Sequence, residues 1–75
     1  MKEIEIHTEY IKLQQVLKLA GIAGQGSDAK LYIKDSMVKV NGIIVTERGK
    51  KIRHNDIVTV QNIGEFKVIE TNAGK

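Results

Sequence analysis

Residues 38–45 read Val38-Lys39-Val40-Asn41-Gly42-Ile43-Ile44-Val45, two runs rich in β-branched residues joined by Asn-Gly. This pattern predicts a hairpin with a type I′ turn, because that turn needs positive φ at both of its central residues. A two-residue turn pairs Val40 with Ile43 and Val38 with Val45. Since side chains alternate along a strand, we expect these four on one face of the hairpin and Lys39 on the other.

A dense group of cations follows the hairpin. Arg48, Lys50, Lys51 and Arg53 fall within six residues, and we expect this segment to be a loop. Four cations this close repel one another, and an anionic partner relieves the repulsion and releases condensed counterions. The alternative interpretation is a loop that is only solvated.

The segment before the hairpin predicts one strand and two helices. Residues 3–6 alternate Glu and Ile, which is typical of a half-buried edge strand with its acids in water. A helical stripe follows, which Gly21 ends as a left-handed cap. Ser27 is expected to cap a second helix, which ends at Asp35-Ser36. The helical stripes are Leu13, Val16, Leu17 and Ala20 in the first helix and Ala29, Tyr32 and Ile33 in the second.

The segment after the basic loop predicts two further strands. A turn at Asn55-Asp56 leads into a strand at 57–60, and a turn at 61–65 leads into a last strand that begins at Phe66. Phe66 is expected in the core. Residues 71–75 are expected to fray, because nothing in them ties the chain end to the fold.

Length and composition limit the class of protein. With 75 residues the chain is expected to form a single domain, 1–75, and it contains no cysteine. Without cysteine, and with His7 and His54 far apart, we expect no disulfide, no metal site and no cofactor. The first residues lack an apolar signal segment, and no apolar run approaches the ~20 residues that span a bilayer, so a cytoplasmic protein without a membrane partner is expected.

Catalysis is not expected. Ser27 and Ser36 have no histidine at a suggestive spacing, and a capping role explains Ser27. No pair of acids falls in a predicted cleft, and a domain this small has little room for a pocket of enzymatic size. The sequence therefore favours a binding protein with no small-molecule substrate.

Charge is segregated along the chain. Residues 11–54 hold nine Lys or Arg and three acids, whereas the remainder holds three Lys and six acids. Such segregation indicates a basic face directed at a polyanion, against the plainer alternative that lysines are common on soluble surfaces. The candidate binding residues are Lys12, Lys18, Lys30, Lys34, Arg48, Lys50, Lys51 and Arg53. Tyr10 is a candidate for stacking on bases, whereas Tyr32 is expected in the core because it lies on a helical stripe.

The order of these features resembles a known family. Leu17-Lys18-Leu19-Ala20, Gly21, residues 38–42, residues 48–52 and Asp56 before the Ile-Val-Thr-Val strand occur in an order and at spacings similar to those of the RNA-binding domain named after small-subunit ribosomal protein S4, also called the αL motif. The likeness is strongest to small free-standing bacterial members, and it runs over residues 11–60.

The resemblance implies an α+β fold, with two short helices packed on a small, strongly bent, mainly antiparallel sheet. Residues 11–60 would be its core, residues 1–10 and 61–70 would add strands, and RNA would lie against the helices and adjoining loops. The sequence departs from the family where many members have Ser-Arg before the second helix and this chain has Gln25-Gly26. A lysine elsewhere does not replace the bidentate contact of that arginine.

We therefore expect a monomeric bacterial protein that binds structured RNA, either ribosomal RNA or ribosomal particles, in the cytoplasm. An alternative is a protein-interaction adaptor that uses the hairpin face around Ile43 and Ile44, with its basic loop on an acidic protein. A third is non-specific DNA binding, which predicts equal affinity for duplex DNA and structured RNA at matched salt.

Overall fold

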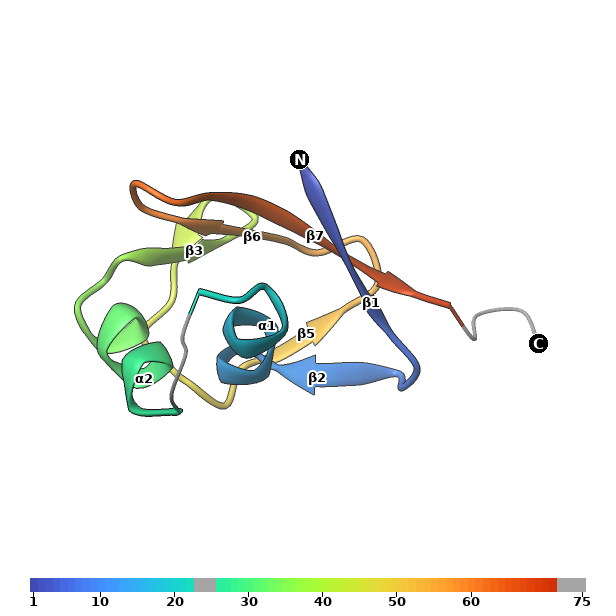
Figure 1. Cartoon of the computed structure of the whole chain (residues 1–75), viewed down its shortest axis with the longest axis horizontal. Helices are drawn as coiled ribbons and strands as arrows, with labels where there is room; N and C mark the ends of the chain where they lie inside the picture. The colour runs from blue at the N-terminus through green and yellow to red at the C-terminus, as the bar shows by residue number, and fades with distance from the viewer. Residues whose placement is uncertain (23–25, 72–75) are drawn as a thin grey trace.

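In a computed structural model, the chain forms two sheets with two helices beside them (Figure 1). The structure describes residues 1–22 and 26–71, and the side chains of residues 26–28 are not part of that description. The larger sheet has the strand order β1 (Lys2–Ile6), β7 (Gly64–Glu70), β6 (Ile57–Val60), β3 (Val38–Val40) and β4 (Ile43–Ile44). The smaller sheet pairs β2 (Tyr10–Lys12) with β5 (Lys51–Arg53), and the helices are α1 (Leu13–Leu19) and α2 (Gly26–Lys34).

The larger sheet is mixed. Neighbouring strands from β7 to β4 are antiparallel, whereas β1 pairs with β7 in parallel, with Lys2 opposite Phe66 and Ile6 opposite Glu70. β1 is an edge strand, as its alternating sequence predicted, and Glu3 and Glu5 are exposed. An α+β fold with two helices on a mainly antiparallel sheet is therefore confirmed, and the strong bend of that sheet stays a prediction.

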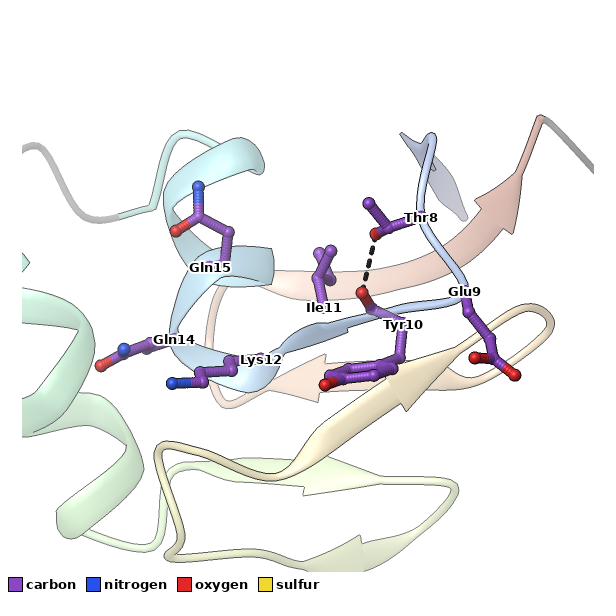
Figure 2. Close-up of a pocket in the computed structure, with 7 residues that line it drawn as sticks. All are labelled: Thr8, Glu9, Tyr10, Ile11, Lys12, Gln14 and Gln15. Atoms are coloured by element: carbon purple, nitrogen blue, oxygen red, sulfur yellow. Dashed lines mark hydrogen bonds between the residues drawn. The ribbon is translucent and has the colours of Figure 1, made fainter.

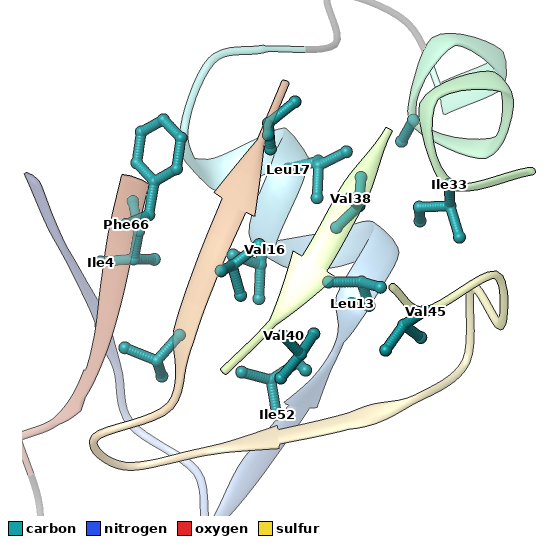
Figure 3. Close-up of a cluster of buried hydrophobic side chains, with 14 of the residues drawn as sticks. Ile4, Leu13, Val16, Leu17, Ile33, Val38, Val40, Val45, Ile52 and Phe66 are labelled. Carbon is teal, nitrogen blue, oxygen red and sulfur yellow. The ribbon is translucent and has the colours of Figure 1, made fainter. Parts of the chain in front are cut away.

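One face of the larger sheet forms one side of the core, and the helices and β5 form the other side (Figure 3). Val38 lies opposite Val60 and Val40 opposite Val58, so their side chains share the buried face. The predicted stripe of α1 is confirmed, because Leu13, Val16 and Leu17 are fully buried against that face, and Phe66 is buried as well. Tyr32 packs at the margin of this core.

The hairpin turn has the predicted backbone. Asn41 and Gly42 have φ of 52° and 84°, the positive values that a type I′ turn needs. Val40 pairs with Ile43, and the Val45 N–H donates to the Val38 carbonyl at 3.1 Å. Because Ile43 lies opposite Val40, it is on the expected face, but it is 70% exposed and is not part of the buried core that includes Val38, Val40 and Val45. β4 is a two-residue strand at the edge of the sheet, and both of its residues are exposed.

Asn41 also fixes the hairpin to a distant turn. Its side-chain carbonyl accepts the Ile57 N–H at 3.0 Å, and its amide donates to the Asp56 carboxylate at 3.1 Å. The other oxygen of Asp56 accepts the Arg53 N–H at 2.8 Å. Asn41 and Asp56 therefore tie the start of β6 and the end of β5 to the hairpin.

Replacing Asn41 with alanine is expected to lower the free energy of unfolding by about 2–3 kcal/mol, since it removes two hydrogen bonds and puts alanine at a positive φ. Asn62→Ala is the matched control, because Asn62 has φ of 65° and lies outside this network. The control is expected to cost only the backbone share, about 1 kcal/mol. Urea denaturation measures both, and equal losses would contradict a structural role for the Asn41 side chain.

Both helices end in the same way. The Gly21 N–H donates to the Lys18 carbonyl and the Ile22 N–H to the Leu17 carbonyl, and Gly21 has φ of 76°. This is a Schellman cap with glycine in its left-handed position, as the sequence predicted. Ser36 has φ of 61° and holds the corresponding position after α2, where the Ser36 and Met37 N–H groups donate to carbonyls of the last turn.

Several boundaries differ from the sequence prediction. Residues 51–53 were expected in a loop, yet they form a strand, and residues 10–12 form a second strand directly before α1. α2 begins at Gly26, so Ser27 lies inside the helix and is not its cap. β7 begins at Gly64 within the predicted turn. Thr71 is held by a hydrogen bond from its N–H to the Ile6 carbonyl, whereas residues 72–75, like Gln25, lie outside the described residues.

Candidate nucleic-acid interface

The two-stranded sheet presents three cations and a tyrosine on one face. In the register of β2 and β5, Tyr10 lies opposite Arg53 and Lys12 opposite Lys51, with Ile11 and Ile52 between them. Ile52 is fully buried and Ile11 packs on the core. Because side chains alternate along both strands, the four flanking residues lie on the outer face, where all four are exposed. We call Tyr10, Lys12, Lys51 and Arg53 the ribbon face.

Tyr10 lies among the cations of the ribbon face. The Lys51 Nζ is 4.9 Å from the centre of the Tyr10 ring, and the Arg53 Cζ is 5.7 Å from it. Both distances lie within the range of cation–π contacts, which restrain the two charged side chains while leaving them accessible to water. No acid occurs in β2 or β5, so none of the four side chains of the ribbon face carries a negative charge.

The basic segment, residues 48–53, is attached to the start of α1 through its backbone. The Leu13 N–H donates to the Lys50 carbonyl at 2.8 Å, and the Gln14 N–H donates to the Arg48 carbonyl at 3.1 Å. Lys12, at the N-cap position, makes no side-chain capping bond. The first N–H groups of a helix have no partner within it, so carbonyls of the basic segment satisfy them instead. These bonds fix where the cations at 48–53 lie relative to α1.

A cleft between α2 and residues 46–49 is lined by three further cations. Its volume is about 730 Å³, and it is lined by Lys30, Leu31, Ile33, Lys34, Thr46, Glu47, Arg48 and Gly49. Lys30 and Lys34 are four residues apart on one side of α2, as their spacing predicted. Along the chain, residues 46–49 of this lining lead into β5, which carries Lys51 and Arg53 (Figure 1). The cleft therefore adjoins the ribbon face.

A second hollow lies between the turn before β2 and the start of α1 (Figure 2). It has a volume of about 450 Å³ and is lined by Thr8, Glu9, Tyr10, Ile11, Lys12, Gln14 and Gln15. The Thr8 hydroxyl donates to the Tyr10 carbonyl at 2.7 Å, which shapes this turn. Polar donors and acceptors thus border the ribbon face beside Lys12.

Two predicted binding residues lie outside these groups. Lys50 lines a hollow of about 370 Å³ with residues of the hairpin, Ile43 and Ile44 among them. It is not among the residues that line the cleft with Arg48. Lys18 is exposed in the last turn of α1, where its charge is favourable at the carbonyl end of a helix. Within the described part of the chain, it lines neither the cleft nor the two hollows.

The histidines have structural partners. The His54 Nδ1 accepts the Glu70 N–H at 2.9 Å, which ties the turn after β5 to the end of β7. The His7 Nδ1 lies 2.7 Å from the Thr71 hydroxyl. Among residues 1–22 and 26–71, no group of three His, Cys, Asp or Glu side chains is arranged to hold a metal ion. In the same residues, no helix is long and apolar enough to cross a membrane.

Sequence reasoning did not place Tyr10 beside the cations. The signal was present as two triplets, Tyr10-Ile11-Lys12 and Lys51-Ile52-Arg53, each with a central isoleucine between polar residues. Polar-apolar-polar alternation over three residues predicts a strand only weakly, because the same pattern fits a helix start or a loop. Pairing of the two triplets supplies the missing information.

Comparison with known proteins gives matches to a family model, to a named bacterial protein and to solved structures. Residues 4–69 match the model of a family described as S4 domain. A Bacillus subtilis (strain 168) protein named probable ribosome maturation protein RlbA is 38% identical over 66 residues, which cover 88% of this chain and 93% of that protein. The crystal structure of 30S ribosomal protein S4e from Thermoplasma acidophilum matches with a TM-score of 0.55 and 19% identity. That match covers 71% of this chain and 28% of the ribosomal protein, and at this identity it bears on the fold alone.

Proposed function

The chain belongs to the S4 domain family, and from that membership we propose that it binds structured RNA of the ribosome or of its precursors. The observation that carries the proposal is the ribbon face, where Lys51 and Arg53 lie against the Tyr10 ring and Lys12 lies opposite Lys51. The name of the Bacillus relative supports a ribosomal RNA target and a cytoplasmic location. The proposed role is binding without catalysis, by a single domain acting as a monomer.

The mechanism is electrostatic docking of a preformed surface. The backbone bonds from α1 to residues 48 and 50 hold the basic segment before RNA arrives, so little ordering entropy opposes binding. Lysines supply sequence-neutral attraction to phosphates, whereas Arg48 and Arg53 can also bind a phosphate through two hydrogen bonds. Lys12, Lys51 and Arg53 form one part of the proposed contact surface, and Lys30, Lys34 and Arg48 form the other. Lys18 and Lys50 are proposed only as peripheral contributors to the field.

A salt series tests this function directly. The affinity for ribosomal RNA fragments is expected to fall with a slope of log K against log[salt] of roughly −4.5 to −5.5, as about five or six phosphate contacts predict. RNA should bind more tightly than a DNA duplex of equal length at every salt concentration. Fluorescence anisotropy measures both, and equal affinity for the two nucleic acids would support non-specific DNA binding instead.

The adaptor alternative rests on the hairpin. Ile43 is 70% exposed and Ile44 52% exposed, so the hairpin end presents apolar surface. An Ile44→Ser variant separates the two functions: RNA affinity is expected to stay within about twofold, because the substitution removes no charge. If Ile44→Ser instead abolishes association with ribosomal particles while RNA-fragment binding persists, the hairpin is a protein contact.

A further inference from the structure

The cleft beside α2 differs chemically from the ribbon face. Besides Lys30, Lys34 and Arg48, its lining includes the apolar side chain of Leu31, which is 56% exposed. Glu47 and Thr46 add a carboxylate and a hydroxyl at the side formed by residues 46–49. The cleft thus combines cations, an apolar wall and a hydrogen-bond acceptor in about 730 Å³, a volume within the range of small-ligand sites.

Phosphate binding alone does not account for this lining. A phosphate gains nothing from Leu31 and is repelled by Glu47. A flipped-out nucleotide matches all three kinds of group, because its base has an apolar face and a polar edge and its phosphate is anionic. Proteins read RNA mainly at such unpaired nucleotides, since the deep groove of an RNA duplex is too narrow for side chains.

We propose that this cleft receives one unpaired nucleotide of the bound RNA. The base lies against Leu31, and the phosphates on either side of it contact Lys30, Lys34 and Arg48. The proposal rests on the RNA-binding function above and adds to it the feature of the RNA that is recognised: a bulged or looped-out nucleotide, next to a duplex that contacts the ribbon face.

Glu47 gives this site a preference among bases. A carboxylate only accepts hydrogen bonds, so it favours a base whose edge carries an exocyclic amino group, as cytosine, adenine and guanine do. Uracil presents a single N–H donor between two carbonyl oxygens on that edge, and these oxygens repel a carboxylate that approaches the N–H. The site is therefore expected to disfavour uridine, and a glutamine at position 47 would accept it, because glutamine both donates and accepts.

The experiment uses hairpin RNAs that differ only in one bulged nucleotide. A bulged guanosine, adenosine or cytidine is expected to raise affinity about tenfold over the fully paired hairpin, through burial of one face of the base against Leu31, and a bulged uridine by much less. A 2-aminopurine at the bulge should change its fluorescence on binding. Glu47→Gln should bring the uridine bulge close to the other three.

Leu31→Ser supplies the test of the apolar wall. It is expected to remove most of the tenfold preference for the bulge while leaving affinity for the paired hairpin within about twofold. Leu19→Ser is the matched control, since Leu19 is 51% exposed on α1 and does not line the cleft. Equal binding of bulged and paired RNAs, unchanged by Leu31→Ser, would overturn this inference and leave RNA binding intact. Failure to bind any of these RNAs would overturn both.

Discussion

Reversing the charges of Lys51 and Arg53 to glutamate is expected to weaken RNA binding about a hundredfold at 0.1 M salt. Each phosphate contact contributes about 0.9 log unit of affinity per tenfold dilution of salt, so two lost contacts remove nearly two log units between 1 M and 0.1 M. The slope of log K against log[salt] should also become less negative by about 2. Fluorescence anisotropy with a ribosomal RNA fragment measures both quantities.

The matched control places the same charge change elsewhere. Lys2 and Lys39 are exposed on the larger sheet and line neither the ribbon face nor the cleft. Lys2→Glu with Lys39→Glu therefore alters the net charge equally but is expected to cost only a few-fold in affinity, through the long-range field. If the control loses as much affinity as the ribbon variant (Lys51→Glu with Arg53→Glu), the attraction depends on net charge and the ribbon face is not the contact surface.

The ribbon variant should keep its fold. Lys51 and Arg53 are exposed, and the hydrogen bond from the Arg53 N–H to Asp56 involves only the backbone of Arg53. Exposed substitutions of this kind usually change stability by no more than about 0.5 kcal/mol. The loss of the two cation–π contacts with Tyr10 adds about 1 kcal/mol at an exposed site. Circular dichroism and the unfolding midpoint verify that weakened binding is not caused by unfolding.

Replacing Ile52 with alanine is expected to lower the free energy of unfolding by about 3 kcal/mol. Ile52 is fully buried, and removing a buried isoleucine to alanine costs about 2–5 kcal/mol through lost transfer energy and the cavity left behind. A domain of this size has only about 4–11 kcal/mol to lose. The midpoint of thermal unfolding should fall by roughly 15 °C, and urea denaturation gives the free energy directly.

This substitution also distinguishes a strand from a loop at residues 51–53. An isoleucine in a solvated basic loop would behave like Ile63, which is 45% exposed in the turn before β7. Ile63→Ala is the control and is expected to cost less than about 1 kcal/mol. Equal, small losses for both variants would contradict the buried position of Ile52 and, with it, the alternation that turns Lys51 and Arg53 outward.

Local chemistry determined the parts of the fold that the sequence predicted correctly. Asn41-Gly42 requires a turn with positive φ, and that requirement depends only on the two residues and their flanking β-branched runs. The stripe of α1 and its end at Gly21 follow from side-chain periodicity and from the freedom of glycine at positive φ. Family membership was likewise readable from the order of these short features along residues 11–60.

Contacts between distant segments decided the rest. β2 and β5 are three residues each, too short for periodicity to identify, and they become strands only because they pair with each other across about forty residues of chain. The parallel pairing of β1 with β7 joins the two ends of the chain and leaves no local signature. The Asn41–Asp56 bonds and the carbonyls of residues 48 and 50 at the start of α1 are of the same kind.

The candidate site likewise has features that the sequence determined and features that only the tertiary structure decided. The sequence alone established that residues 11–54 are basic and that arginines and lysines concentrate after the hairpin. It did not determine which of those cations share a surface, because neighbours in a strand point to opposite faces. Pairing of β2 with β5 placed Lys12, Lys51 and Arg53 on one face with Tyr10, and the approach of residues 46–49 to α2 formed the cleft. Charge is a property of composition, whereas its geometry depends on which segments the folded chain buries together.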